Sequence, residues 1–405
     1  MNILMITPYL PYPIVSGGQI RTYNLLRLLS KKHQITLMSF IRENHETQYI
    51  PQLQKFCHQV ITLKRTPKAW HPRNILKAGI TSYPFVVCLY LYPEIKQTIK
   101  NELDTERYDL IHAETFYVMP NIPQTQIPIL LVEQVIEYLV YQRFTEMLPW
   151  YAFPLKPLLY IDVAKIKKWE RFYWRQAQGL AAMSEEDKQF MLNLEPDLKI
   201  DVVANGVDIE HFSQTKKITT KRPTVLFIGN FKWLPNKDAA KFLVDQIWPS
   251  IKKQIPQAQL WIVGGNPTPD IIALGKPNEI KVDGGVNDIR DAYANSDVLL
   301  APIRNGRGTK YKILEAMATR TPIVGTELAV EGVDIINTQH ALVADDPQQL
   351  AQHTVAILTK PKINQKLTSA AYQLVKDAYS WNKIAKELDQ LYHRLAQTKY
   401  QNNQS

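Results

Sequence analysis

Segment 301–324 combines glycines, basic side chains and a carboxylate in an order that suits a phosphate-bearing ligand. It follows an apolar, strand-like run and leads into a helical pattern that begins at about Thr309. Gly306 and Gly308 would let a phosphate lie close to the backbone, and the N–H groups near Thr309 and Lys310 would face it. The basic side chains able to neutralise the phosphate are Arg304, Arg307 and Lys310.

Glu315 lies about two turns into the same helical pattern. A carboxylate at that position can accept hydrogen bonds from both hydroxyls of a ribose, so the segment as a whole predicts a nucleotide site. The alternative is a basic loop before a core helix, with Glu315 paired to Lys312 or close to Tyr311.

A second glycine-containing loop, residues 8–18, lies between the first strand-like run and a helical segment at 19–31. Gly17 and Gly18 allow close backbone approach, and the helix that follows offers its N-terminus to an anion. A plain strand-to-helix turn explains the same residues. The loop lacks the Gly-x-Gly-x-x-Gly fingerprint, which argues against a nicotinamide dehydrogenase.

The composition is that of an ordinary globular protein and suits an anionic partner. The chain has 405 residues, 45% of them apolar and 21% charged, with a net charge of +10. Its two cysteines, Cys57 and Cys88, indicate structural thiols and a reducing cytoplasm. The start of the chain reads as a strand rather than a signal peptide, and we expect a soluble, cytoplasmic protein.

Strand-like runs alternate with helical patterns along the whole chain, which predicts parallel sheets covered on both faces. The runs in the first half are 3–7, 35–40, 60–63, 109–113, 129–132, 180–183 and 201–203. Those in the second half are 225–229, 260–263, 280–282, 298–301, 323–325 and 341–343. Polar residues near 205–222 predict a break between two α/β domains.

Segment 301–324 resembles the donor site of GT-B glycosyltransferases, in particular the retaining family 4, the group 1 glycosyl transferases. In that family two glutamates with seven residues between them bracket a glycine-rich loop, and the second binds the donor ribose. Glu315 matches the second glutamate, whereas Arg307 stands in place of the first, which normally holds the transferred sugar. The resemblance implies a GT-B fold of two facing Rossmann-like domains with a cleft between them.

Residues 227–240 resemble the first strand and loop of the family's donor domain, where a basic pair commonly meets the diphosphate. Asn230 stands where the arginine is usual, so the resemblance leaves Lys232 or Lys237 to bind the diphosphate; a solvated surface charge is the alternative for each. We expect an acceptor-side domain at 1–204 and a donor domain at 205–380. A terminal helix at 381–400 would return to the first domain.

In the first domain, His112 and Glu114 end a strand where acceptor-side residues of this fold often lie, so both are candidate catalytic residues. A satisfied structural histidine is the alternative. Residues 133–137 resemble a His-Asn-Val-Glu stretch of relatives, in which Gln134 replaces the histidine and Glu137 stays a candidate.

The resemblance implies transfer of a sugar from a nucleotide-diphosphate sugar to a glycan or lipid-linked acceptor, with retention. No Asp-x-Asp pair occurs, so we expect no metal site and no cofactor. The diphosphate must then be stabilised by basic side chains and N–H groups, with front-face departure and attack. A non-catalytic nucleotide- or glycan-binding protein and a nucleotide-sugar epimerase remain as alternatives.

Residues 150–175 interleave basic and aromatic side chains. One interpretation is a contact with the inner face of the cell membrane, near a lipid-linked acceptor. The other is a solvated helix face with an aromatic core side. No nucleic-acid motif accompanies the stretch, and we expect no nucleic-acid partner.

Overall fold

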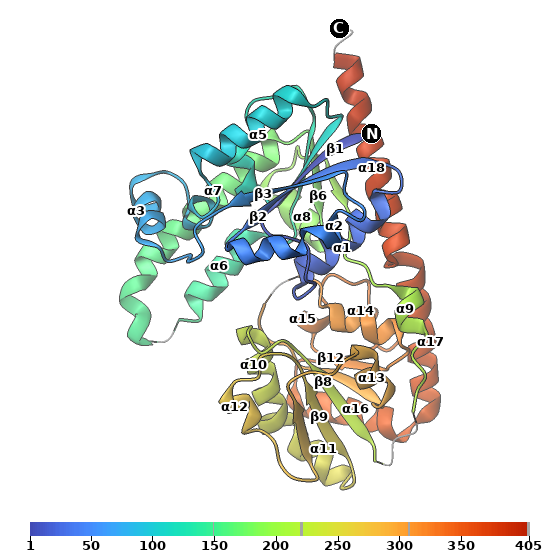
Figure 1. Ribbon diagram of the computed structural model, residues 1–405. Coiled ribbons are helices and arrows are strands. Elements are labelled where there is room, and N and C mark those ends of the chain that lie inside the picture. The colour runs from blue at the N-terminus through green and yellow to red at the C-terminus, as the bar shows by residue number, and fades with distance from the viewer. Residues whose placement is uncertain (149, 219–221, 307, 403–405) are drawn as a thin grey trace. The chain divides into compact units, whose positions relative to one another are not determined.

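The computed structural model describes residues 1–148, 150–218, 222–306 and 308–402. The chain divides into two compact units (Figure 1). Unit 1 comprises Met1–Ala204 together with Ile384–Ser405, and unit 2 comprises Asn205–Lys383.

Unit 1 is built on a seven-stranded parallel sheet in the order β3-β2-β1-β4-β5-β6-β7. Its strands are β1 (Asn2–Thr7), β2 (Gln34–Ile41), β3 (Gln59–Lys64), β4 (Leu110–Glu114), β5 (Ile129–Val132), β6 (Gly179–Ala182) and β7 (Ile200–Val202). The central strands are buried along nearly their whole length, as expected of a parallel sheet covered on both faces.

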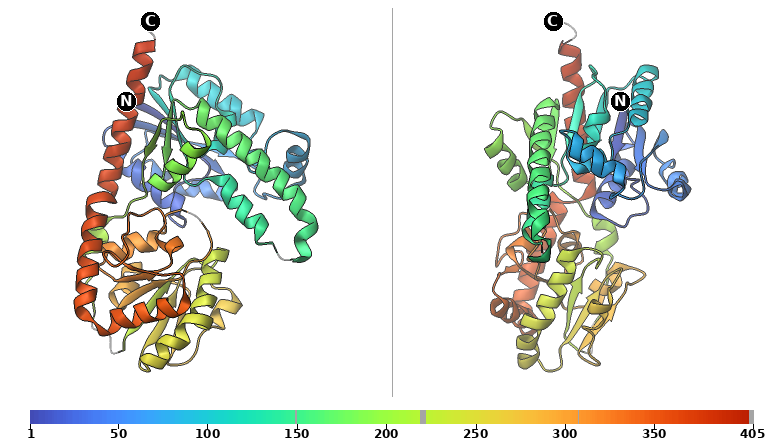
Figure 2. Two further views of the ribbon diagram at one scale, coloured as in Figure 1. Left: turned by 180° about the vertical axis from the view of Figure 1, so that it is seen from behind. Right: turned by 90° about the vertical axis from the view of Figure 1, so that its left-hand side faces the viewer.

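Helices cover both faces of this sheet (Figures 1 and 2). They are α1 (Gly17–Leu29), α2 (Ile50–Leu53), α3 (Pro72–Ile80), α4 (Phe85–Cys88), α5 (Pro93–Thr105), α6 (Glu137–Glu146), α7 (Lys156–Gln176) and α8 (Glu185–Leu194). Three short 3₁₀ segments accompany them: η1 (Asn44–Tyr49), η2 (Phe116–Asn121) and η3 (Trp150–Leu155).

Unit 2 repeats the architecture with a six-stranded parallel sheet in the order β10-β9-β8-β11-β12-β13. Its strands are β8 (Thr224–Ile228), β9 (Gln259–Val263), β10 (Ile280–Asp283), β11 (Val298–Ala301), β12 (Ile323–Gly325) and β13 (Leu342–Val343). Its helices are α9 (Ile209–Ser213), α10 (Leu234–Phe242), η4 (Leu243–Ile247, a π-helix), α11 (Trp248–Gln254), α12 (Pro269–Ile272), α13 (Ile289–Ala294), α14 (Tyr311–Ala318), α15 (Glu327–Val330), α16 (Pro347–Thr359) and α17 (Pro361–Ala378).

Each sheet reverses its strand order once, and this reversal fixes where a ligand can approach the backbone. In unit 1 the reversal lies between β1 and β4, and in unit 2 between β8 and β11. Loops that leave the carboxyl ends of two such strands go to opposite faces of the sheet and open a crevice between them. The loops after β8 and β11 are therefore the first place to look for a ligand site in unit 2.

The last helix, α18 (Trp381–Asn402), is continuous, and its residues from Ile384 onward belong to unit 1 (Figure 2). Asp389 of α18 accepts hydrogen bonds from Lys32 and lies 2.9 Å from Nε2 of His33. Leu388 and Tyr392 are fully buried. Among the described residues, no helix combines the length and the apolar character needed to cross a bilayer.

The prediction of two parallel α/β domains is confirmed, and each of the thirteen predicted strands is present. Two helix starts differ by two residues from the prediction. The helix predicted at 19–31 begins at Gly17, because Ser16 provides its N-cap, and α14 begins at Tyr311 rather than at about Thr309.

Candidate nucleotide site

The loop after β8 packs directly on the loop after β9. A Cβ at Gly264 would lie 1.7 Å from the carbonyl oxygen of Gly229, so any side chain at Gly264 would force the two loops apart. The Phe231 N–H donates to the Gly265 carbonyl at 2.9 Å. This backbone contact holds residues 229–233 in place at the carboxyl end of β8.

Asn230 is used inside this loop. Its Oδ1 accepts from the Lys232 N–H at 3.0 Å and from Nδ2 of Asn266 at 3.2 Å. Its carbonyl accepts from Nδ2 of Asn236 at 2.9 Å. Lys232 is exposed, Lys237 is partly buried, and neither forms an ion pair within the described part of the chain. Asn230 therefore shapes the loop, and any cation from this element must come from the two lysines.

Arg304, in the loop after β11, is already neutralised. Its Nη2 lies 2.7 Å from Oδ1 of Asp238, its Nε donates to Oδ2 at 3.2 Å, and its guanidinium carbon lies 4.0 Å from the centre of the Phe242 ring. Asp238 also accepts from Nδ2 of Asn305. Arg304 thus braces this loop against α10. Arg307, the other arginine predicted to meet the phosphate, lies outside the described residues.

Gly306 and Gly308 are required by their backbone conformation, with φ values of +100° and +81°. Thr309 follows them, and its hydroxyl donates to the Gly332 carbonyl at 3.5 Å. Lys310 lies 3.5 Å from Oε2 of Glu331. The predicted glycine-rich loop therefore passes the carboxyl end of β11 and is fastened to the segment after α15.

Helix α14 starts without a side-chain cap. Lys310 occupies the N-cap position and forms no side-chain capping hydrogen bond, and the first turn contains no acidic residue. Uncapped N–H groups carry a partial positive charge and favour an anion. The start of α14 thus suits a phosphate, as the sequence predicts.

Lys312, in the first turn of α14, is the residue that sequence reasoning missed as a ligand. Its Nζ donates to Oδ1 of Asn236 at 3.1 Å and lies 4.9 Å from the centre of the Phe227 ring. Burial lowers the pKa of Lys312 to about 7, with repulsion from Lys310 acting in the same direction. A lysine in the first turn of a helix is unfavourable by itself, which makes this ammonium group a strong candidate for binding an anion.

Glu315 lies one turn further along α14. Its Oε2 accepts a hydrogen bond from the hydroxyl of Tyr293 at 2.9 Å, and Tyr293 is fully buried. Burial raises the pKa of Glu315, while the Tyr293 hydroxyl and Lys312 lower it. The partner of Glu315 is therefore a tyrosine of α13. One carboxylate oxygen is fixed by this bond, and the second has no protein hydrogen-bond partner among the described residues.

The candidate catalytic residues of unit 1 form a buried network. His112 and Glu114 are both fully buried, and Nε2 of His112 lies 3.2 Å from Oε1 of Glu114. The other ring nitrogen of His112 lies 2.5 Å from the hydroxyl of Tyr392 on α18. Gln134 donates to Glu114 and accepts from the Tyr9 hydroxyl. This geometry favours a structural role for the pair, and their part in catalysis stays a prediction.

Replacing Glu114 with glutamine tests the structural role. Burial raises the pKa of Glu114, but the hydrogen bonds from His112 and Gln134 and the charges of His112 and Arg21 together outweigh it, so the pKa is lowered overall. The charged form is thus favoured in the folded state, and its contribution is lost as the pH falls through this lowered pKa. We expect Glu114→Gln to reduce the free energy of unfolding at pH 7 by about 1–2 kcal/mol. Urea unfolding at pH 7 measures this change, and equal stability of the two proteins would contradict it.

Gly18, predicted to approach a ligand, lies against this network. A Cβ at Gly18 would fall 1.8 Å from the hydroxyl of Tyr9 and 2.6 Å from Oε1 of Gln134. Gly17 is the first residue of α1. Tyr9 and Gln134 therefore leave no space for a side chain at position 18. The donor contact of Gly17 and Gly18 stays a prediction.

Glu137 begins α6 and differs from the buried pair. Its side chain is only partly buried and forms no hydrogen bond or ion pair among the described residues. Burial nevertheless raises its pKa to about 7. Its N–H donates at 2.7 Å to Glu170, whose carboxylate caps the helix. Among the candidates of unit 1, Glu137 has the side chain best placed to reach a ligand.

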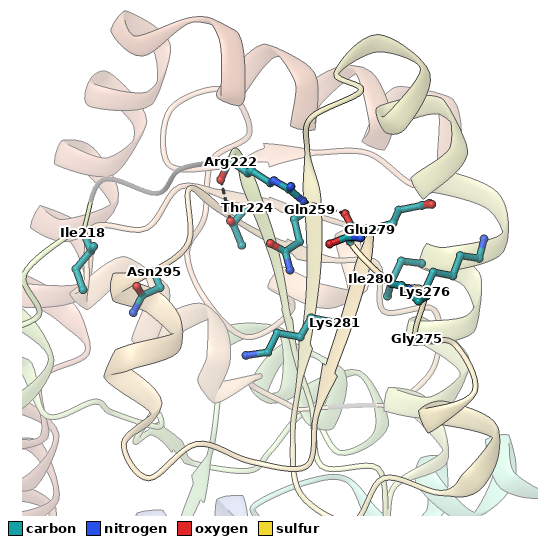
Figure 3. Close-up of a pocket in the computed structure, with 12 residues that line it drawn as sticks. Ile218, Arg222, Thr224, Gln259, Gly275, Lys276, Glu279, Ile280, Lys281 and Asn295 are labelled. Carbon is teal, nitrogen blue, oxygen red and sulfur yellow. Dashed lines mark hydrogen bonds between the residues drawn. The ribbon is translucent and has the colours of Figure 1, made fainter.

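A hollow on unit 2 lies at the amino ends of the strands, opposite the carboxyl ends where the candidate nucleotide site lies (Figure 3). It is lined by residues at the amino ends of β8, β9 and β10, including Thr224, Gln259 and Ile280. It therefore does not coincide with the nucleotide site at the carboxyl ends. Across the described ranges, no three histidine, cysteine or acidic residues gather as metal ligands would.

Comparison with known proteins agrees with this geometry. Residues 222–360, which contain the loops after β8 and β11 and helix α14, match the family model described as Glycosyl transferases group 1. The phosphatidyl-myo-inositol mannosyltransferase of Mycobacterium leprae (strain TN) is 27% identical over 203 residues. That alignment covers 48% of this chain and 53% of the relative, so the match spans about half the length of the mannosyltransferase.

Solved structures match over nearly the full chain. Sucrose-phosphate synthase from Thermosynechococcus elongatus has a TM-score of 0.71 at 18% identity and covers 98% of this chain and 99% of its own. Anabaena Alr3699/HepE, solved in complex with UDP and glucose, has a TM-score of 0.65 at 14% identity, with 97% and 100% covered. The chain thus has the GT-B fold, and its residues 222–360 match the glycosyl transferases group 1 family.

Proposed function

We propose that the protein is a glycosyltransferase that moves a sugar from a nucleotide-diphosphate sugar to a glycan or lipid-linked acceptor. The observation that carries this proposal is the order of groups on α14: an uncapped N-terminus, then Lys312, then Glu315. The first two suit a diphosphate and the third a ribose. The group 1 domain and the UDP bound by the HepE relative support it.

The chemistry follows from where negative charge develops. As the sugar–phosphate bond breaks, the diphosphate gains charge, and donors already in place stabilise the transition state more than the ground state. In this proposal the ammonium group of Lys312 and the first N–H groups of α14 supply that stabilisation. Lys232 and Lys237 contribute from the loop after β8, where Asn230 replaces the usual arginine.

Retention, metal independence and the family 4 type belong to the same proposal. The glutamate that normally holds the transferred sugar is absent at Arg307. Because no carboxylate among the described residues is identified as a nucleophile, departure and attack would occur on one face of the sugar. Product analysis by NMR tests this point, because an inverted anomeric centre would exclude retention. Transferase activity that is unchanged when a metal chelator is added would support metal independence.

One experiment separates transfer from the two alternatives. The chain is incubated with UDP-, GDP-, ADP- and dTDP-sugars, with and without membrane or polysaccharide extracts, and released nucleoside diphosphate is measured. Release that depends on acceptor supports the proposal. Conversion of the sugar without acceptor would indicate an epimerase, and nucleotide binding without turnover would indicate a non-catalytic binding protein.

The proposal also places unit 1 at a membrane surface. Large apolar side chains are exposed on three segments: α3 with Trp70 before it, the carboxyl half of α6, and η3 with the first half of α7. They include Ile75, Leu76, Ile80, Phe144, Met147, Phe153, Leu155, Leu158 and Ile161. Lys165 of α7 donates to the carbonyls of Ala78 and Thr81, so α3 lies beside α7 (Figure 2).

Basic residues accompany these apolar side chains, among them the exposed Arg73 of α3 and the partly buried Lys156 of α7. Apolar and basic side chains together suit an anionic bilayer. Part of the predicted stretch 150–175 does not take part, because Trp174 is buried and donates to Glu133. The membrane contact proposed here thus includes less of α7 than the predicted stretch 150–175, and it adds α3.

Leu158→Asp is the variant that tests this contact. We expect the wild type to sediment with phosphatidylglycerol vesicles, less so at high salt, and Leu158→Asp to bind at least about tenfold more weakly. Ile272→Asp, an exposed isoleucine of unit 2, is the matched control and should bind as the wild type does. Equal sedimentation of all three proteins would contradict the proposal.

A further inference from the structure

Arg65 carries a buried charge that no carboxylate neutralises within the described residues. It follows β3 directly, is 5% exposed, and its Nε has no hydrogen-bond partner. One terminal nitrogen donates to the Thr66 carbonyl at 3.0 Å. The guanidinium carbon lies 5.1 Å from the centre of the Tyr90 ring. A buried guanidinium with an unused donor is unfavourable unless an anion joins it.

Arg65 and its neighbours lie at the carboxyl ends of the parallel strands, where ligands bind in this class of fold. Tyr90 stacks on Tyr117, which follows β4, with ring centres 4.9 Å apart. Arg42, the first residue after β2, is exposed. Burial raises the pKa of Tyr90, Arg65 and Arg42 lower it, and Glu137 raises it. Two cations, from the ends of β3 and β2, and one carboxylate, from the start of α6, thus act on one phenol group.

We propose that Arg65, assisted by Arg42, binds an oxyanion of the acceptor, either a phosphate ester or a sugar carboxylate. Arginine suits this task because its planar fork meets two oxygens of a phosphate or carboxylate at once. Glu137, a partly buried carboxylate at the start of α6, accepts a hydroxyl of the same acceptor. This inference rests on the proposed function, since it names the chemistry of the group that receives the sugar.

The test compares charged and neutral sugars on the full chain. Glucose 6-phosphate, glucuronate and glucose are titrated by calorimetry. In the wild type we expect at least one charged sugar to bind about tenfold or more tightly than glucose, as one charge-assisted contact allows. The preferred sugar distinguishes phosphate from carboxylate. In Lys312→Met the preference should persist, which excludes binding at the nucleotide site of unit 2.

Arg65→Gln should remove the preference, and Arg65→Lys should keep part of it. Arg320→Gln is the matched control, because Arg320 lies over the Tyr372 ring at 3.8 Å but is exposed. A preference that survives Arg65→Gln, or no preference in the wild type, would overturn the inference. Nucleotide binding by Arg65→Gln reports separately on its folding and on the donor site. If Arg65→Gln loses the preference for charged sugars but still binds nucleotide, the loss is due to the missing guanidinium and not to misfolding or to damage at the donor site.

Discussion

Glu315→Ala is expected to raise the Kd of the preferred nucleoside diphosphate about 100-fold. The free carboxylate oxygen would accept the ribose hydroxyls, and hydrogen bonds to a charged group contribute about 1.5–3 kcal/mol each. Titration of wild type and variant with UDP, GDP, ADP and dTDP measures the change. The nucleotide that binds the wild type most tightly also identifies the donor class.

Tyr293→Phe is the matched control for this loss. It removes the hydroxyl that donates to Glu315 but keeps the carboxylate and the aromatic ring. The ribose contact should survive, so we expect a much smaller rise in Kd than for Glu315→Ala. If Glu315→Ala binds every nucleotide as the wild type does, Glu315 does not contact the ribose and the nucleotide site has been placed wrongly.

The part of this site that could be predicted from sequence is the part determined by local pattern. Gly306 and Gly308 between a strand and a helix indicate a phosphate loop, and their positive φ values are as expected of glycine there. Glu315 follows from helical spacing in the same segment. These residues lie close together in sequence, and short-range periodicity describes such segments well.

Other contacts depend on residues far apart in the chain, which no local pattern reveals. Arg304 is predicted as a phosphate ligand, and its ion pair with Asp238 could not be predicted from the sequence. His112 is predicted as a catalytic residue, and its contact with Tyr392 on the last helix could not be predicted either. From the sequence, Lys312 is a candidate ion-pair partner of Glu315, whereas in the fold its ammonium group donates a hydrogen bond to Asn236. Helices α3 and α4 were not predicted, because they are short and α3 presents apolar residues to the surface.

The two sheets also explain why the candidate residues gather where they do. In unit 2 they follow β8 and β11, the two strands beside the reversal of strand order. In unit 1, His112 and Glu114 lie at the end of β4, which is beside the reversal, and Glu137 follows the next strand, β5. Thr115, directly after β4, has φ +71°, which is strained for a β-branched residue. Strain of this kind persists where the surrounding structure holds it, and it is common beside ligand sites. The carboxyl edge of unit 1 is thus the natural place for the acceptor in our proposal.

Lys312→Met is expected to have opposite effects on stability and on nucleotide binding. The pKa of Lys312 is about 7 in the folded protein, against 10.5 as its ordinary value, because burial disfavours the charged form. The folded state therefore binds fewer protons than the unfolded state between these values, and Lys312 destabilises the fold increasingly as the pH falls from about 10 to 7. The methionine variant should be more stable at pH 7, on the order of 1–2 kcal/mol in urea unfolding.

Binding changes in the other direction, since a diphosphate favours the protonated lysine. Between pH 7 and 9 the terminal phosphate is already ionised, its second pKa being about 6, so the change in affinity reports on the protein. We expect the wild-type Kd to rise by up to about tenfold per pH unit above 7, and the Lys312→Met Kd to be weaker and nearly constant. A variant that is both less stable and pH-dependent would show that Lys312 serves the fold and that another group meets the diphosphate. A more stable variant with weak, pH-independent binding would show that Lys312 binds the anionic ligand and that its buried charge destabilises the fold.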